Sequence, residues 1–442
     1  MHCDAVVVGM GPGGEEVAGK LAQAGLDVVG IEAELVGGEC PYWGCIPSKM
    51  MVWAAELLAE GRRIPGNAGT SAIVPDWAPV ARRIRAATDA WDDKVAVDRF
   101  EGKGGHFIRG RARLTGPASV EVNGEEITAK RALVVATGAR AWIPPAFDAV
   151  PHWTNREAIA TETVPDSLLV VGGGPVGLEI GQVMSRFGAA VTIAEAGDRL
   201  ALAEEPEASE LLTAILRREG VTVLTGVDLV RAESLGKHGC TAHFADGSSV
   251  TASRVLVATG RRPDLAALGV GALGLDDAVH GIPVDARLRV LPGVWAVGDV
   301  TGVGAFTHVA MYQARICAAD ILGHDVDEAD YRALPRVTFT DPELGSVGLT
   351  EADARRSGGD VRVMHEPIPS SARGWINRSE GLIKLVERDG VLVGATSMGP
   401  FGGEVLGLLT LAVHARVPVR TLQNMIYAYP TFHRAIESAL WS

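Results

Sequence analysis

The sequence predicts an α/β protein with two βαβ domains of the same kind, followed by a C-terminal α+β domain. A strand, a glycine-rich turn, a helix and a second strand follow one another near the N-terminus, and the same order returns about 163 residues later. After residue 328 strand-like segments and a hairpin pattern replace the βαβ order.

The first βαβ unit occupies the first ~35 residues. Val6–Val8 is a continuous β-branched run, which is typical of a buried parallel strand. The turn Gly9–Gly14 follows, and Glu15–Ala24 is predicted to be a helix. Asp27–Ile31 is the second predicted strand, and it ends at Glu32.

The second unit repeats this order. Leu168–Val171 is the first predicted strand, Gly172–Gly177 is the turn, and Leu178–Phe187 is the helix. Ala190–Ala194 is the second strand, and again an acid, Glu195, stands at its end. The copies are too far apart for a solenoid period, so they indicate a repeated domain.

Each turn fits a dinucleotide site. Glycines let the backbone approach a pyrophosphate at a helix N-terminus, and an acid after the next strand accepts hydrogen bonds from a ribose. A lone Gly-x-Gly-x-x-Gly is weak, but two in this context predict two Rossmann-like domains. The candidate binding residues are Gly9, Gly11, Gly13, Gly14 and Glu32 in the first unit, and Gly172, Gly174, Gly177 and Glu195 in the second.

Two further observations concern the second site and the domain repeat. The carboxylate of Glu195 would repel a 2′-phosphate, which favours NADH over NADPH, although Arg199 lies near enough to soften that preference. Ala132–Gly138 and Val255–Gly260 are apolar strands that both end in Ala-Thr-Gly, one after each glycine turn.

The C-terminal region has a different pattern. Arg336–Thr340 and Gly381–Val386 are strand-like, and the latter pairs with Val391–Ser397 across an Arg-Asp-Gly hairpin turn. Helices are expected at about 402–415 and 418–426.

Composition excludes several classes of protein. The 442 residues carry 41 basic and 54 acidic side chains, a net charge of −13, which argues against nucleic acid as a partner. No apolar run of membrane-spanning length and no signal-peptide pattern occurs, so we expect a cytoplasmic protein without a membrane partner. Five cysteines in so long a chain do not form a secreted disulfide framework.

The segment Gly37–Lys49 carries the most specific pattern, Gly-Gly-Glu-Cys-Pro-Tyr-Trp-Gly-Cys-Ile-Pro-Ser-Lys. A regular helix would place the Cα atoms of Cys40 and Cys45 about 8.6 Å apart, beyond the ~7 Å limit for a disulfide. The intervening proline and glycine favour a distorted turn, and Pro47 suits the first turn of a helix to about residue 60. By itself the pair is either redox-active or two reduced, buried thiols; no second ligand pair supports a metal site.

This segment resembles the Gly-Gly-x-Cys-x4-Cys-Ile-Pro-Ser-Lys motif of the class I pyridine nucleotide-disulfide oxidoreductases. That family includes glutathione reductase, dihydrolipoamide dehydrogenase and mercuric reductase. The resemblance runs nearly end to end: Val297–Asp299 is similar to the second FAD motif, and Asp341–Glu351 to the start of the dimerisation domain.

The resemblance implies FAD at the first turn and NAD(P)H at the second. It implies four segments: residues 1–150 and 266–328 as the FAD-binding domain, 151–265 as the NAD(P)-binding domain, and 329–442 as the dimerisation domain of a homodimer. It adds to the FAD site Gly38, Lys49, Thr137, Gly138, Gly298 and Asp299, with Asp299 on the ribityl chain, and to the NAD(P) site Gly260.

The resemblance also implies roles for the side chains. Electrons would pass from NAD(P)H through FAD to a Cys40–Cys45 disulfide, with Cys45 facing the flavin and Cys40 exchanging with a small or peptidic disulfide substrate. Lys49, paired with Glu179, would place a cation near the flavin. We read Cys3, Cys240 and Cys317 as structural.

The sequence departs from the family near its C-terminus. The family's His-Pro…Glu motif reaches the active site from the partner subunit, but here Tyr429 stands at the His position and Arg434 at the Glu position. A phenol is a poor base near neutral pH. Tyr429 is still able to donate a hydrogen bond, and His433 is either a substitute base or a surface residue. The chain has no cysteine after Cys317, which argues against mercury reduction.

A second departure is Tyr42-Trp43, which either narrows substrate access or packs in the core. Three hypotheses follow. The first is an NAD(P)H-dependent flavoprotein disulfide reductase. The second is a reductase of a quinone, a metal ion or oxygen on the same scaffold. The third, from another class, is a non-catalytic redox sensor.

Overall fold

The computed structural model describes residues 1–442, which divide into two compact units. The first unit comprises Met1–Ser48, Ala81–Trp142 and Gly260–Asp330; the second comprises Lys49–Val80, Ile143–Thr259 and Tyr331–Ser442. Two helices, α3 (Cys45–Arg63) and α4 (Ala78–Ala87), run across unit boundaries.

The first unit contains an eight-stranded sheet whose central path has the order β16-β17-β6-β1-β2-β3. Pairing is parallel from β17 through to β3, and only β16 and the β4–β5 extension are antiparallel. The strands are β1 (His2–Val8), β2 (Val28–Glu32), β3 (His106–Arg109), β4 (Arg113–Gly116), β5 (Ser119–Val122), β6 (Glu125–Val135), β16 (Arg289–Leu291) and β17 (Val294–Ala296). Two further short strands, β7 (Arg140–Ala141) and β15 (Arg261–Arg262), pair antiparallel with each other outside this sheet.

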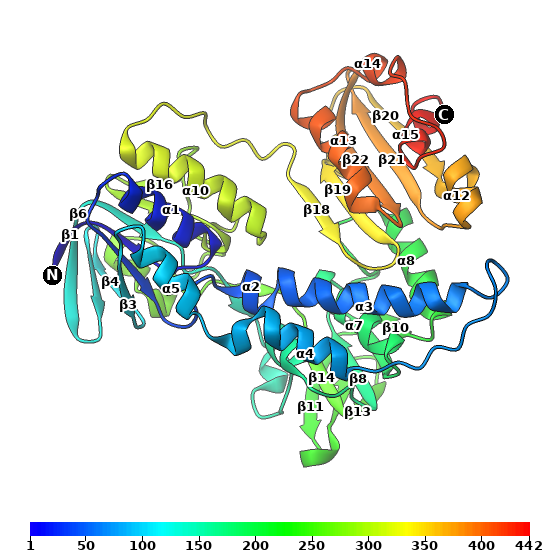
Figure 1. The fold of residues 1–442 in the computed structure, drawn as a ribbon, viewed down its shortest axis with the longest axis horizontal. Coiled ribbons are helices and arrows are strands. Elements are labelled where there is room, and N and C mark those ends of the chain that lie inside the picture. The colour runs from blue at the N-terminus through cyan, green and yellow to red at the C-terminus, as the bar shows by residue number, and fades with distance from the viewer. The chain divides into compact units, whose positions relative to one another are not determined.

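Helices α1 (Pro12–Gln23) and α10 (Thr307–Leu322) run side by side in this unit (Figure 1). The two helices are in close contact at Gly13, where a Cβ would lie 3.4 Å from the Cβ of Ala310. A core cluster on their side of the sheet joins Val7, Val17 and Ala314. The remaining helices of the unit are α2 (Glu39–Trp43), α5 (Lys94–Glu101) and α9 (Leu265–Leu268).

The second unit contains a parallel four-stranded sheet of order β10-β9-β8-β14 and a three-stranded antiparallel sheet. Its first turn, helix and strands repeat the βαβ order of the first unit. The elements are α6 (Asn155–Ala160), β8 (Ser167–Val171), α7 (Pro175–Arg186), β9 (Ala190–Glu195), α8 (Pro206–Arg218), β10 (Thr222–Thr225), β11 (Leu229–Ser234), β12 (Cys240–Phe244), β13 (Ser249–Ala252) and β14 (Arg254–Val257).

The C-terminal part of the second unit is an antiparallel five-stranded sheet of order β18-β19-β22-β21-β20, with helix α13 packed on it (Figure 1). The predicted hairpin is present, because β21 and β22 pair antiparallel. The elements are β18 (Pro335–Thr338), β19 (Glu343–Gly348), α11 (Glu351–Arg356), β20 (Val361–Pro367), α12 (Ala372–Asn377), β21 (Leu382–Arg388), β22 (Val391–Gly399), α13 (Gly402–His414), α14 (Val419–Gln423) and α15 (His433–Leu440).

The predicted fold class is therefore confirmed: two Rossmann-like domains and a C-terminal α+β domain. Helices α1 and α7 begin three residues earlier than we predicted, because each takes its proline as the first helical residue after an extended glycine, Gly11 or Gly174. None of the helices combines the length and the apolar character that crossing a membrane requires.

Candidate active site

The first glycine turn is shaped by close backbone contacts. Gly9 has φ +91°, and a Cβ on it would lie 2.4 Å from the carbonyl oxygen of Ala136. A Cβ on Gly14 would lie 1.9 Å from the Gly9 carbonyl oxygen. The turn therefore needs glycine at both ends, and it lies against Ala136 and Thr137, which follow β6. Gly138, the next residue, has φ +66°.

The second turn uses the same packing. Gly172 has φ +111°, and its Cβ would lie 2.3 Å from the carbonyl oxygen of Ala258. A Cβ on Gly177 would lie 2.2 Å from the Gly172 carbonyl oxygen. Gly260, which ends the second Ala-Thr-Gly segment, also has a positive φ, +107°. Both Ala-Thr-Gly segments thus lie against their own turns.

The two acids are held alike. The carboxylate of Glu32 accepts hydrogen bonds from the backbone N–H groups of Met10 and Glu34, both at 2.8 Å. The carboxylate of Glu195 accepts from Gly173 at 2.6 Å and from Gly197 at 2.7 Å. Burial raises the pKa of Glu32, and the two backbone donors oppose that rise. Each carboxylate is therefore fixed beside its glycine turn.

Both helix starts fit a phosphate. Neither Gly11 nor Gly174, the residues that precede α1 and α7, supplies a side-chain cap. A Cβ on Gly174 would meet nothing within 4 Å, so the space in front of this helix is open. Backbone N–H groups at an uncapped helix start attract anions. The residues present therefore fit the pyrophosphate of a bound dinucleotide.

Asp299 lies in the first unit after β17. Burial raises its pKa, and the guanidinium of Arg261, with Nε 3.7 Å from its carboxylate, opposes that rise. Arg261 also approaches Glu39, 3.5 Å away. Gly298 has φ +82°, and its N–H donates to the buried side chain of Gln313 at 2.6 Å. Sequence reasoning missed Arg261 and Gln313, although Arg261 directly follows the second Ala-Thr-Gly segment.

The cysteine segment packs on the first turn. Gly38 has φ +66°, and a Cβ on it would lie 2.8 Å from the Cα of Gly11. As predicted, the two cysteines do not share a regular helix: α2 ends at Trp43, Gly44 has φ −139° and ψ −117°, and α3 begins at Cys45. The segment is thus held directly beside the turn that fits a pyrophosphate.

Cys45 contacts Thr307, the first residue of α10, with 3.3 Å between Sγ and Oγ1. Because 262 residues separate them, no local pattern indicated this contact. Tyr42 is buried, so it packs in the core. Trp43 is only half-buried and stacks on Trp91, with ring centroids 5.3 Å apart.

The ion pair expected between Lys49 and Glu179 is present. The Lys49 ammonium lies 2.7 Å from the Glu179 carboxylate, which is only 7% exposed. The same ammonium lies 4.6 Å above the ring of Phe339. Lys49 follows Cys45 by one helical turn on α3.

The remaining cysteines lie in cores. Cys3, Cys240 and Cys317 are all buried. Burial raises the pKa of the Cys3 thiol to about 11, and it also raises the pKa values of Cys240 and Cys317. Thiols of this kind are poor nucleophiles, which suits structural residues.

The C-terminal segment carries Tyr429 on an exposed loop before α15, with its side chain 70% exposed. His433 is the first residue of α15 and is half-buried. Arg434 pairs with Glu437 at 2.6 Å, and its guanidinium lies 5.8 Å from the centre of the Tyr429 ring. The arginine at the family's Glu position therefore pairs within its own helix.

Two dinucleotide-type turns and a cysteine segment packed on the first of them define a flavoprotein disulfide oxidoreductase. The pyridine nucleotide-disulphide oxidoreductase model matches residues 3–314, and its dimerisation-domain model matches residues 334–440. The chain belongs to this family, whose cofactors are FAD and a pyridine nucleotide.

The similar proteins include members of this family with different activities. The chain is 34% identical to a dihydrolipoyl dehydrogenase of Thermus scotoductus, over 99% of this chain and 96% of the relative. It is 31% identical to a mercuric reductase of Bacillus cereus, over 99% of this chain and 71% of the relative. Among solved structures, the Cu(II) complex of the HOCl-induced flavoprotein disulfide reductase RclA of Escherichia coli matches with a TM-score of 0.88 at 25% identity, covering 100% of this chain and 99% of RclA.

Proposed function

We propose that this protein uses NADH to reduce a small or peptidic disulfide through Cys40 and Cys45. The observation that carries the proposal is the contact of Gly38 with Gly11, which holds the cysteine segment on the first nucleotide turn. In this proposal residues 1–150 and 266–328 bind FAD, residues 151–265 bind NADH, and residues 329–442 form the interface of a cytoplasmic homodimer.

The cofactors supply the transfer of a hydride and then of two electrons to the Cys40–Cys45 disulfide. Cys40 then attacks one sulfur of the substrate disulfide and releases one thiol. Cys45 attacks the mixed disulfide at Cys40, which restores the Cys40–Cys45 bond and releases the second thiol. One NADH and one proton are consumed for each disulfide reduced to two thiols.

Neighbouring side chains support these roles. The hydroxyl of Thr307, 3.3 Å from the Cys45 sulfur, is placed to donate a hydrogen bond to a thiolate there. The Lys49 ammonium supplies a positive charge that favours negative charge on the reduced cofactor and on Cys45.

Proton transfer to the substrate thiols is assigned to the C-terminal segment of the partner subunit. Tyr429 takes the place of the family's histidine in this proposal, because its hydroxyl lies on an exposed loop and is free of the core. His433 is the alternative donor. Comparing the pH profiles of Tyr429→Phe and His433→Gln distinguishes the two residues, since only loss of the donor removes a limb of the profile.

The contacts of Glu195 and Arg199, the two charged residues at the proposed ribose position, support a preference for NADH. Glu195 is fixed by two backbone N–H groups, and the Arg199 guanidinium donates to the carbonyl oxygens of Ala201 and Leu202, at 3.1 and 2.9 Å. Arg199 is thus engaged away from a 2′-phosphate.

We therefore expect Glu195→Ala to lower kcat/KM for NADH about tenfold while changing kcat/KM for NADPH little or raising it. Steady-state kinetics with both coenzymes measure this. The control is Glu34→Ala, because Glu34 is a half-buried acid two residues after β2 whose side chain pairs with Arg140. Equal losses with both coenzymes would contradict the assignment.

The proposed function is tested by anaerobic titration with NADH. The wild-type protein should give a two-electron-reduced form with a long-wavelength charge-transfer band, since a thiolate at Cys45 would face the flavin. Cys45→Ser should lose this band and Cys40→Ser should keep it. A band that persists in Cys45→Ser would overturn the role of Cys45.

A second candidate function, reduction of a planar acceptor such as a quinone, is favoured by the tryptophan pair. Trp43 lies one turn after Cys40 and stacks on Trp91. Three consecutive residues, Asp89, Ala90 and Trp91, have φ values of +48°, +52° and +62°, a rare conformation that holds this ring over Trp43. A flat aromatic surface suits stacking against a planar molecule.

A further inference from the structure

The Lys49–Glu179 pair has a third member that sequence reasoning did not identify. Phe339, just after β18, donates its backbone N–H to the second oxygen of the Glu179 carboxylate at 2.9 Å. Its ring also lies beneath the Lys49 ammonium, 4.6 Å from the ring centre. One residue therefore contacts both members of the ion pair, through its backbone and through its side chain.

Two residues after Phe339, the backbone of Asp341 is hydrogen-bonded to helix α7. The side chain of Gln182 makes two hydrogen bonds to the backbone of Asp341: its oxygen accepts from the N–H at 2.8 Å, and its amide donates to the carbonyl oxygen at 3.0 Å. Gln182 follows Glu179 by three residues, so both lie on one face of α7. The amide thus fixes the register of this segment against Glu179.

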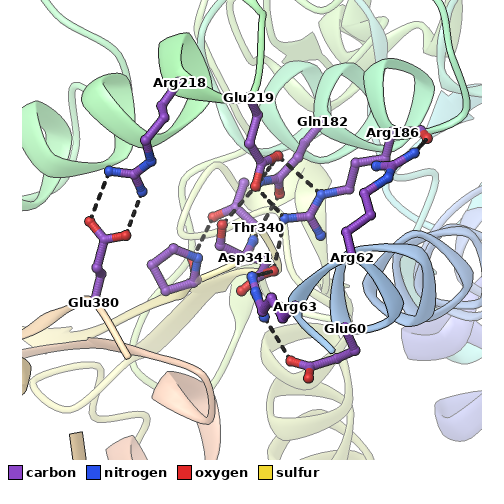
Figure 2. Close-up of polar contacts among 11 residues, drawn as sticks. Glu60, Arg62, Arg63, Gln182, Arg186, Arg218, Glu219, Thr340, Asp341 and Glu380 are labelled. Carbon is purple, nitrogen blue, oxygen red and sulfur yellow. Dashed lines mark hydrogen bonds and ion pairs between the residues drawn. The ribbon is translucent and has the colours of Figure 1, made fainter. Parts of the chain in front are cut away.

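Ion pairs of Asp341 with two arginines add to these hydrogen bonds (Figure 2). The carboxylate of Asp341 accepts hydrogen bonds from Arg186 at 2.8 Å and from Arg63 at 2.5 Å. Arg186 is 4% exposed and also forms a two-pronged pair with Glu219, at 2.7 and 3.0 Å. A buried guanidinium that pairs with two carboxylates keeps a defined geometry, because loss of those partners leaves an uncompensated buried charge.

The same contacts hold helix α3 at two places. Lys49 and Arg63 are 14 residues apart on α3, which brings them to nearly the same helical face about 21 Å apart. Lys49 meets Glu179 and Phe339, whereas Arg63 meets Asp341. The segment from Phe339 to Asp341 therefore bridges α3 and α7.

The geometry points to Phe339 as a positioning residue that holds the Lys49 ammonium for electron entry, with Gln182 and Asp341 keeping Phe339 in place. This inference rests on the proposed function, in which Lys49 lies near the flavin. Through this segment the C-terminal domain sets the position of the cation that favours the reduced cofactor. Displacements of about 1 Å at reacting groups are enough to lower rates up to about 100-fold.

The test uses the flavin-loaded protein and two variants. Phe339→Leu removes the ring but keeps the backbone N–H, and Gln182→Met removes both side-chain hydrogen bonds to Asp341. Both should reduce the rate of flavin reduction by NADH about tenfold and lower the flavin midpoint potential, with little change in KM for NADH. A change only in melting temperature, with rate and potential as in the wild type, would overturn the inference.

Glu380→Gln is the matched control. Its carboxylate pairs with Arg218 and joins α8 to the C-terminal domain, apart from the contacts of Asp341 (Figure 2). The Glu380→Gln variant should leave both the rate of flavin reduction and the flavin midpoint potential unchanged.

The pH must be held constant in these comparisons. Burial, together with the charges of Asp341 and Glu343, raises the pKa of Glu56 on α3 to about 7, so its charge changes near neutral pH. All variants are therefore compared at one pH.

A second measurement separates this inference from the proposed function. The rate at which an acylating reagent labels Lys49, followed by mass spectrometry, reports the accessibility of the ammonium without any turnover. Labelling should rise several-fold in Phe339→Leu and Gln182→Met and stay unchanged in Glu380→Gln. Unchanged labelling in the first two variants would contradict the positioning role, whereas failure of NADH to reduce the wild-type flavin would contradict only the proposed function.

Discussion

Cys40→Ser is expected to reduce disulfide turnover by a factor on the order of 10⁴ or more, while NADH still reduces the flavin. A serine hydroxyl at this position does not attack a disulfide, so the exchange step is lost, and loss of an essential nucleophile typically has effects of this size. The measurement is stopped-flow reduction of the flavin by NADH, followed by mixing of the reduced protein with a small disulfide.

The same variant separates the two candidate functions. If a quinone oxidises reduced Cys40→Ser as fast as it oxidises the wild-type protein, and disulfides oxidise neither, then the planar acceptor is the physiological class and the disulfide proposal fails. Cys240→Ala is the control, since this buried thiol lies in the core of the second unit and should leave both reactions intact.

Gly9→Ala is expected to reduce bound flavin at least about tenfold. The residue would keep φ +91°, which L-residues with a Cβ rarely adopt, and its Cβ would lie 2.4 Å from the Ala136 carbonyl oxygen. The turn must then open, which moves Gly11 and the start of α1 away from the pyrophosphate position. Flavin absorbance per protein, after purification, measures the effect.

Two matched variants accompany this prediction. Gly25 has nearly the same φ, +87°, but a Cβ there meets nothing within 4 Å. Gly25→Ala should therefore keep its flavin and lose about 1–2 kcal/mol of stability through the strained φ alone. Gly172→Ala places the same clash in the second turn, so it should keep flavin and lose reduction by NADH. If Gly172→Ala lost flavin and Gly9→Ala kept it, the assignment of the two sites would be reversed.

Sequence patterns predicted the parts of the site that depend on neighbouring residues. The two turns, their closing acids and the break between Cys40 and Cys45 follow from local backbone needs: positive φ, close approach and the interruption of a helix at Gly44. The helix starts were misplaced by three residues, because the proline within each predicted turn is already the first residue of the helix.

Contacts between segments far apart in the sequence could not be predicted from local patterns. Thr307 reaches Cys45 across 262 residues, and Phe339 reaches Glu179 across 160. Nothing near Thr307 or Phe339 in the sequence distinguishes either residue from an ordinary helix start or strand end. Strands β19 and β20 were likewise missed, because pairing with distant strands stabilises them more than their own residue pattern indicates.

The two nucleotide turns and the spaced cysteine pair could be recognised from the residue pattern alone, because glycine and proline constrain the backbone within a few residues of themselves. The side chains around these features became known only from the folded chain: the hydroxyl beside Cys45, the guanidinium beside Asp299, and the phenylalanine that contacts both Lys49 and Glu179. Such contacts depend on how separate strands and helices pack, and packing is set by the whole chain.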